Sequence, residues 1–172
     1  AMVGAVPKFY GGRLEGMVFV DGKATTQMDI PDLANHIGVV LADYDTQLVT
    51  MTVREEVAFA MENRGYDRDV IEARCAEVFK QVGIEGLEDR KITSLSGGQR
   101  QRLVIASVLA TNPSVLVLDE PTNHLDIHAK DELARALRDF KGTIVLVSHE
   151  PEFYESWITD IWNIEDWTTK IV

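Results

Sequence analysis

The sequence predicts an α/β fold built on a parallel sheet. Short apolar runs that are typical of buried strands occur at 37–41, 115–118 and 143–147. Segments with apolar residues at helical spacing lie between them, and strands that alternate with helices favour a parallel strand order. The last two runs end in acidic residues or a histidine, and sites in such sheets form at the carboxyl ends of strands.

In the first half of the chain, a strand at 14–20 is expected to end at the turn Asp21-Gly22, and a short helix covers 31–36. After the strand at 37–41, helices are expected at 53–62 and 68–82, broken by Gly65 and ended near Gly83. Together they form an α-helical insertion, at about 50–95, between the strands.

In the second half, 96–99 has the S-x-x-Q pattern of a capping box, so a helix begins at Ser96 and runs to Asn112-Pro113. A helical apolar stripe before Gly142 predicts another helix, on Leu133, Ala136, Leu137 and Phe140. Pro151 starts a short helix through Trp157, and 158–164 and 168–172 are expected to form a terminal hairpin.

Composition narrows the classes of function. The chain has 172 residues, of which 45% are apolar, enough for one domain with a core. No apolar run is long enough for a membrane span, and the first residues lack the basic and apolar pattern of a secretory signal, so neither is expected. A net charge of −11 argues against nonspecific nucleic-acid binding, so no direct nucleic-acid partner is expected.

The single cysteine and two neighbouring arginines are not expected to have chemical roles. The lone Cys75 lies on a helical apolar stripe, so it is expected to be buried, and it fits a reducing, cytoplasmic compartment. Arg100 and Arg102 are near neighbours, and we interpret them as a solvated helix face rather than a binding site.

Three polar residues are expected to converge at the carboxyl edge of the sheet. Asp119 ends a buried strand, where a carboxylate can hold Mg²⁺ directly or through water. Glu120 beside it could orient or deprotonate an attacking water. His149 ends the next strand and could contact a γ-phosphate. Such a set suits phosphoryl transfer from a nucleotide, which needs charge neutralisation and a positioned water.

The helix start at Ser96 is a second candidate site. Gly97 and Gly98 offer bare backbone N–H groups at a helix N-terminus, where the dipole also favours an anion. The alternative, a capped helix with flexible glycines, stays open at this point.

These segments resemble the ABC ATPase family, in the family's order. Leu-Ser-Gly-Gly-Gln at 95–99 matches the signature motif, 115–122 matches Walker B, and 122–126 matches the D-loop. The resemblance implies a three-layer P-loop-type (RecA-like) parallel sheet that uses ATP and Mg²⁺. It implies a metal role for Asp119 and catalytic roles for Glu120 and His149. It also implies contacts to the nucleotide of a second ABC nucleotide-binding domain, from Ser96, Gly97, Gly98, Gln99 and Asp126.

Two groups within the family share the resemblance. Residues 1–120 are similar to energy-coupling-factor importer ATPases, for example at 9–16, 45–48 and 53–59. Residues 122–172 look more like ABC-F proteins, soluble members that act on ribosomes. A chimera joined near 119–122 is therefore one interpretation. The implied parent function is ATP hydrolysis coupled to solute import, with a membrane transporter subunit as a partner at the inner face of the membrane.

The sequence departs from the family pattern in two places. These 172 residues contain no Walker A pattern, and the nearest decoy, at 16–25, has one residue too many between its glycines and Ala24 after its lysine. Ala42 stands where the family has the Q-loop glutamine, which touches Mg²⁺ and the attacking water. We therefore expect 1–172 to be a single partial domain that lacks the Walker A strand and helix and is impaired in hydrolysis alone.

A sheet without that inner strand would expose unpaired N–H and C=O groups, so self-association through the sheet is expected as an alternative to a second ABC domain. Two other functions stay open. One is a non-catalytic structural or designed chimera with no nucleotide role, which Mg-ATP would not stabilise. The other is an ABC-F-like module that cosediments with ribosomes.

Overall fold

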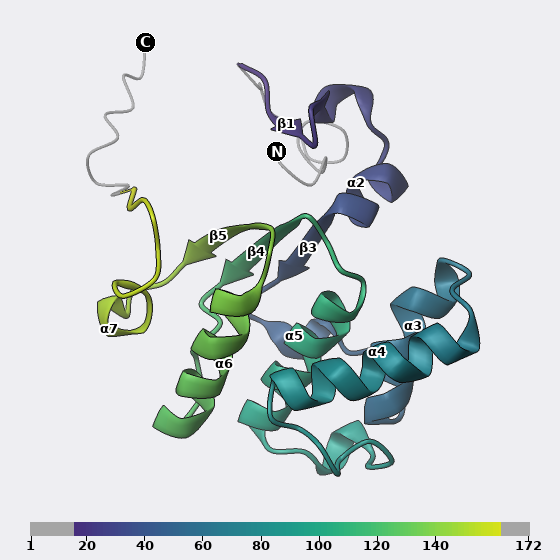
Figure 1. Cartoon of the computed structure of the whole chain (residues 1–172). Helices are drawn as coiled ribbons and strands as arrows, with labels where there is room; N and C mark the ends of the chain where they lie inside the picture. Colours follow the sequence, from purple (N-terminus) through teal and green to yellow (C-terminus); the bar gives the residue numbers. More distant parts are fainter. Residues whose placement is uncertain (1–15, 163–172) are drawn as a thin grey trace.

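A computed structural model describes residues 16–162 of the chain (Figure 1). Its centre is a three-stranded parallel sheet in the order β3-β4-β5. The strands are β3 at Ile37–Val40, β4 at Val115–Asp119 and β5 at Thr143–Val147. Because β4 pairs in parallel with both neighbours, the predicted α/β class with a parallel sheet is confirmed.

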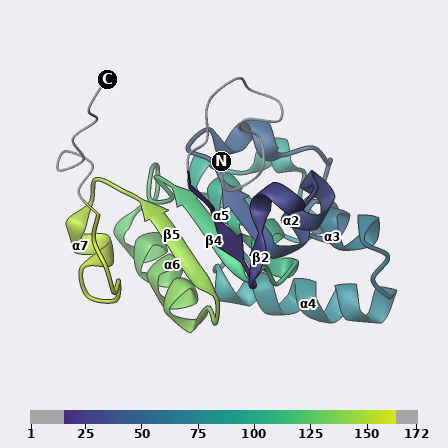
Figure 2. The ribbon, with the colours of Figure 1, turned by 90° about the horizontal axis from the view of Figure 1, so that it is seen from above.

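Both faces of the sheet are covered, as Figures 1 and 2 show. Successive side chains of β3 and β4 point to opposite faces. Val40, Leu116 and Leu118 enter the main core, which the helices α5 and α6 share. Ile37 and Val115 enter a smaller cluster with three residues of the N-terminal segment, Val20, Met28 and Leu33. The sheet is therefore the middle of three layers.

The helices agree closely with the predicted ones. Their bounds are α2 at Ile30–His36, α3 at Val53–Asn63, α4 at Arg68–Gln81, α5 at Gly97–Ala110, α6 at Ile127–Asp139 and α7 at Pro151–Tyr154. Single turns of 3-10 helix occupy η1 at Thr25–Gln27, η2 at Tyr44–Gln47 and η3 at Ile92–Ser94. A short antiparallel hairpin joins β1 at Phe19–Val20 to β2 at Lys23–Ala24. The first part of the predicted strand at 14–20 lies outside the described residues.

The end of the chain differs from the prediction. The α7 helix ends at Tyr154, and in the turn that follows Trp157 N–H and Ile158 N–H both donate to the carbonyl of Tyr154. Residues 158–162 form no strand, so the predicted hairpin is wrong for this stretch. The remaining residues of that hairpin, 163–172, lie outside the described part.

The α5 helix is the most deeply buried helix element. Leu103, Ile105 and Ala106 have no exposed surface, and the helix lies against β3 on one side and against α3 and α4 on the other. It begins with the predicted capping box, since Gln99 N–H donates to Ser96 Oγ and Ser96 N–H donates to Gln99 Oε1. The position of its first turn is therefore fixed by both packing and capping.

The α3–α4 pair is anchored by satisfied polar groups. The Glu56 carboxylate is buried, and its Oε2 accepts hydrogen bonds from Val49 N–H, Thr50 N–H and the Thr50 hydroxyl.

Cys75 is buried on α4 as expected, and burial raises the pKa of its thiol. In the described part of the chain, no helix has the length and apolar character needed to cross a bilayer.

A polar cluster ties the β1–β2 turn to the starts of β3 and β4. The Asp21 carboxylate accepts a 2.6 Å hydrogen bond from the Ser114 hydroxyl and lies 2.6 Å from His36 Nδ1. These two contacts hold the pKa of Asp21 below its ordinary value. Asp21 itself has a left-handed φ of 49° in the predicted turn.

Both β3 and β5 are edge strands of the sheet within the described residues. Within residues 16–162, β5 pairs only with β4, and the middle residues of β5 are half-buried rather than buried. An edge of this kind is expected for a sheet without the Walker A strand, and self-association through it stays a prediction.

The contact between β3 and α5 yields a stability prediction. A Cβ at Gly38 would lie 2.3 Å from Val108 Cγ1 and 3.0 Å from Pro113 Cγ. Gly38→Ala should therefore lower the free energy of unfolding by about 1–3 kcal/mol through overpacking. In urea titrations, the loss of unfolding free energy caused by Gly38→Ala should be smaller in a Val108→Ala background than in the parent chain. Equal costs in both backgrounds would show that this close approach does not limit the packing.

Candidate functional site

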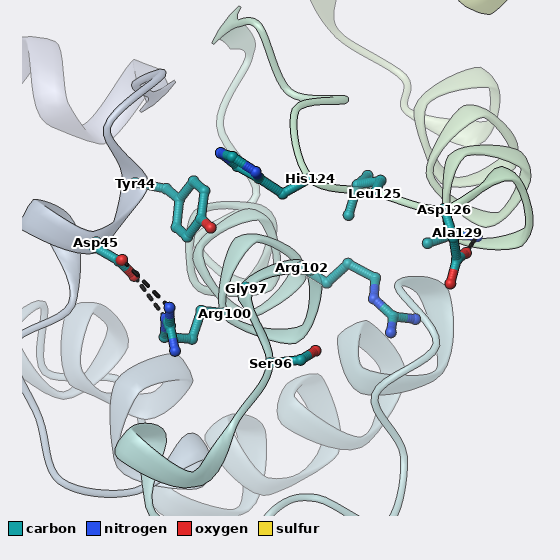
Figure 3. A pocket seen from close by; sticks show the side chains of 11 residues that line it. Tyr44, Asp45, Ser96, Gly97, Arg100, Arg102, His124, Leu125, Asp126 and Ala129 are labelled. Atoms are coloured by element: carbon teal, nitrogen blue, oxygen red, sulfur yellow. Dashed lines mark hydrogen bonds and ion pairs between the residues drawn. The ribbon is translucent and has the colours of Figure 1, made fainter.

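A pocket of about 650 Å³ opens at the start of α5, and we call it the α5 pocket (Figure 3). Three segments that lie far apart in the sequence line it. They are η2 and its surroundings, the start of α5, and the segment from His124 into α6. The lining residues are Tyr44, Asp45, Ser96, Gly97, Gly98, Arg100, Arg102, His124, Leu125, Asp126 and Ala129.

The two glycines allow the neighbouring loops to approach α5 closely. A Cβ at Gly98 would lie 3.2 Å from the carbonyl oxygen of His124, and one at Gly97 would lie 3.2 Å from the Tyr44 hydroxyl. Both residues belong to the first turn of α5, where backbone N–H groups have no helical carbonyl to bond. The pocket therefore combines closely packed loops with a helix N-terminus that favours an anion.

The arginines of α5 are structural parts of this pocket, so their interpretation as a solvated face is wrong. Arg100 Nε donates to Asp45 Oδ1 at 2.7 Å, and Arg100 Nη1 donates to the carbonyl of Leu95. Arg102 Nη1 donates to the Gly83 carbonyl at 2.9 Å and to Glu132 Oε2 at 3.1 Å. The acidic partner of each arginine lies on a different element, so spacing within the sequence could not reveal either pair.

The His124–Asp126 segment forms the opposite wall. His124 has a left-handed φ of 64°, and its ring meets Tyr44 edge to face at 6.2 Å between centroids. Asp126 Oδ1 accepts a 2.8 Å hydrogen bond from Ala129 N–H, so Asp126 is the N-cap of α6 and lines the pocket as well. Tyr44 and His124 are lining residues that sequence reasoning missed. His124 lies within the segment 122–126 that matches the D-loop, whereas Tyr44 belongs to no pattern that would single it out.

A second group lies at the carboxyl edge of the sheet. Glu120 follows β4 and His149 follows β5 closely, and Glu120 Oε2 lies 2.7 Å from His149 Nδ1. The hydrogen bond to Glu120, together with the carboxylate charge, raises the pKa of His149 above its ordinary value. The structure thus brings these two predicted residues together, while their catalytic roles stay predictions.

The backbone of Glu120 is held in a strained conformation. Its φ of 48° lies in the left-handed region, which costs a non-glycine residue on the order of 1–3 kcal/mol. Three hydrogen bonds fix it: Glu120 N–H donates to the Val147 carbonyl at 2.9 Å, and the Glu120 carbonyl accepts from Asn123 N–H at 3.2 Å and from Gln101 Nε2 at 3.4 Å. The surrounding fold therefore determines where the Glu120 carboxylate points.

The remaining predicted site residues fall in different places. Ser96, Gly97, Gly98 and Asp126 line the α5 pocket, whereas Gln99 does not line it and uses its side chain in the capping box. Asp119 ends β4 opposite Val147. No cluster of three or more potential metal ligands occurs within residues 16–162. Mg²⁺ is commonly held by one or two carboxylates plus substrate phosphates, so Asp119 fits a Mg²⁺ ion that arrives with a nucleotide.

A glutamine lies in the loop after β3, at a different position from the one the family pattern requires. Gln47 Oε1 accepts from Leu41 N–H at 2.8 Å, and Gln47 Nε2 donates to the Val39 carbonyl at 3.0 Å. Its amide therefore stabilises the end of β3, next to the Ala42 position.

Comparison with known proteins gives consistent matches. A family model described as ABC transporter matches residues 9–123. A putative ABC transporter ATP-binding protein of Pyrococcus abyssi is 42% identical over 87% of this chain and 55% of the relative. An energy-coupling factor transporter ATP-binding protein, EcfA1 of Streptococcus thermophilus, is 35% identical over 83% of this chain and 54% of the relative. The chain thus spans about half the length of these two relatives.

Solved structures match in fold as well. The structure of cbiO1 from Clostridium perfringens, described as part of the ABC transporter complex cbiONQ, has a TM-score of 0.73 at 33% identity and covers 83% of this chain and 59% of that chain. A dimeric ATP-binding cassette in a post-hydrolysis state with ADP and phosphate has a TM-score of 0.70 at 29% identity, over 81% of this chain and 65% of that chain.

The contact between Glu120 and His149 yields a pH prediction. Glu120→Gln removes the carboxylate that raises the pKa of His149, so the pKa should fall toward 6.5 in an NMR titration. Asp45→Asn removes a carboxylate that contacts Arg100 instead, and should leave the pKa of His149 in place. An unchanged pKa in Glu120→Gln would contradict the contact.

The same contact predicts the direction of a stability change. The pKa of His149 is raised in the folded chain. The contribution of the Glu120–His149 contact to the stability of the folded chain is therefore fully present below the unfolded pKa of His149, and it is lost as the pH rises through the folded pKa. The stability difference between the parent chain and Glu120→Gln should therefore widen as the pH falls from about 8 toward about 5.

Proposed function

This chain belongs to the ABC transporter ATP-binding family, and from that premise we propose that it supplies the signature half of an ATP site shared with a second ABC domain. The observation that carries the proposal is the α5 pocket. Ser96, Gly97 and Gly98 bring a helix N-terminus to a cavity wall. Arg100 and Arg102 line the same cavity, with their charges paired to Asp45 and Glu132. An anionic phosphate group of ATP suits this chemistry.

The proposed complex obtains its phosphate loop from the partner. These 172 residues hold no Walker A pattern, so the nucleotide would bind mainly to the partner's loop, and the α5 pocket would close over its phosphates. In this arrangement the chain is impaired in hydrolysis alone, and ATP turnover occurs only in a mixture with the intact domain. Residues 1–172 would then act as one partial domain, whether or not a chimera junction lies near 119–122.

At the carboxyl edge, the roles that we propose follow from charge and geometry. Asp119 would hold Mg²⁺ and Glu120 would orient or deprotonate the attacking water. The imidazole of His149 uses Nδ1 toward Glu120, which leaves Nε2 to face a phosphate. Its raised pKa favours the protonated, positively charged form, which suits that partner. Such a set can act only on a nucleotide whose phosphates are held at this edge.

We propose solute import as the process that the complete protein powers, with a membrane transporter subunit as a partner. The similarity to an energy-coupling factor ATP-binding protein and to a component of cbiONQ supports this. The chain also exposes large apolar side chains on α3 and in the loop before it, including Val49, Met51 and Phe59. The three hydrogen bonds to Glu56 hold the loop that presents Val49 and Met51.

A charge placed at the pocket tests the proposal. Ser96→Asp keeps an N-cap residue but adds a negative charge where a phosphate would bind, so it should abolish Mg-ATP-dependent association with an intact ABC domain. Sedimentation velocity with and without Mg-ATP measures the association. Ser94→Asp is the matched control, because the Ser94 hydroxyl donates to the Lys91 carbonyl outside the pocket, and this variant should associate normally.

The other outcomes of the association experiment would each contradict the proposal or favour a different function. Lack of association by a folded parent chain would contradict the proposal and favour the structural protein without a nucleotide role. Equal association of both serine variants would place the nucleotide away from the α5 pocket. Cosedimentation with ribosomes that does not depend on an ABC partner would favour the ABC-F-like module.

A further inference from the structure

Gln101 is a buried amide near the start of α5, at the point where the helix enters the apolar core. Only 1% of the residue is exposed, and its neighbours Leu103 and Ile105 have no exposed surface. Burying an amide in such surroundings is unfavourable unless it forms hydrogen bonds. Gln101 Oε1 has no hydrogen-bond partner within the described residues. Its Nε2 donates to the carbonyl oxygen of Glu120 at 3.4 Å.

This contact joins two regions that the sequence separates. Gln101 lies three residues after Gly98 on α5, so it belongs to the same helix as the wall of the α5 pocket. Glu120 lies at the carboxyl edge of the sheet and contacts His149. Among the three hydrogen bonds that fix the strained Glu120 backbone, Gln101 supplies the one that comes from a side chain.

We propose that Gln101 is a positioning residue that holds Glu120 in its left-handed conformation, and thereby couples the α5 pocket to the Glu120–His149 pair. A shift of the α5 N-terminus would move the amide and change the direction of the Glu120 carboxylate. The significance of this coupling for ATP hydrolysis rests on the proposed function, whereas the contact itself is a property of the free chain.

The chemistry of the amide explains why an apolar side chain could not replace it. A methionine at this position would match the length and satisfy the core, but it has no N–H group to donate to the Glu120 carbonyl. A left-handed non-glycine residue persists only where its surroundings over-determine it. Loss of one of the three anchors should therefore let the segment at Glu120 relax and weaken the contact with His149.

The experiment reads His149 directly in the folded 172-residue chain without nucleotide. At one fixed pH, the ¹⁵N resonance of His149 Nδ1 is compared among the parent chain, Gln101→Met and Glu120→Gln. Glu120→Gln gives the position of the resonance when the carboxylate contact is lost. We expect Gln101→Met to move the resonance at least halfway from the parent position toward that reference.

Thr111→Val is the matched control on the same helix. It removes a buried polar group at the other end of α5, where the Thr111 hydroxyl donates to the Val108 carbonyl, and it should leave the His149 resonance in place. A resonance of folded Gln101→Met that stays at the parent position would overturn the proposal, as would an equal shift in Thr111→Val.

A second measurement on the parent chain guards against a variant that fails to fold. If Gln101 Nε2 is bonded to Glu120 in the core, its side-chain amide protons should exchange with solvent far more slowly than those of the exposed Asn63. Equally fast exchange would overturn the proposal. Because neither measurement uses ATP or a partner, its failure is distinguishable from a failure of the ATP-dependent association.

Discussion

The burial of α5 between the sheet and the α3–α4 pair is the constraint on which the rest of the structure depends. The helix lies against β3, against both helices of the insertion and, at its start, against η2. Gly38 permits the approach to β3, because any side chain there would meet Val108. At the other end, the capping box fixes the first turn, so the N–H groups of Gly97 and Gly98 take up a definite position. One packed element thus sets the core and the pocket at once.

The same helix relates the two candidate sites to each other. Its first turn forms a wall of the α5 pocket, and Gln101, one turn further on, reaches the backbone of Glu120. The segment from Glu120 to Asp126 is a second connection between the two sites, because it starts at the carboxyl edge of the sheet and ends at the N-cap of α6, which lines the α5 pocket. Both Glu120 and His124 have left-handed φ angles, which indicates a segment shaped by its surroundings rather than by its own preference.

Most of the secondary structure could be predicted from the sequence because it follows from local patterns. The apolar runs gave the strands at 37–40, 115–119 and 143–147 nearly to the residue, and Ser96 with Gln99 identified the start of α5. The parts that could not be predicted depend on contacts between distant segments. Asp45 with Arg100 and Gln101 with Glu120 are pairs of this kind, and a single sequence contains no signal for either. The strand predicted over 158–162 was wrong, because strand propensity alone does not determine the structure of a segment that starts in the turn at Tyr154.

We propose that this chain contributes the α5 pocket, and its partner a phosphate loop, to one shared ATP site. The decisive measurement is the amount of tightly bound ATP per purified complex of this 172-residue chain with an intact ABC domain. We expect one ATP per complex, held between the partner's phosphate loop and the α5 pocket. Two ATP per complex would mean that this chain builds a phosphate site of its own, and a complex that holds none would mean that association does not involve a shared nucleotide.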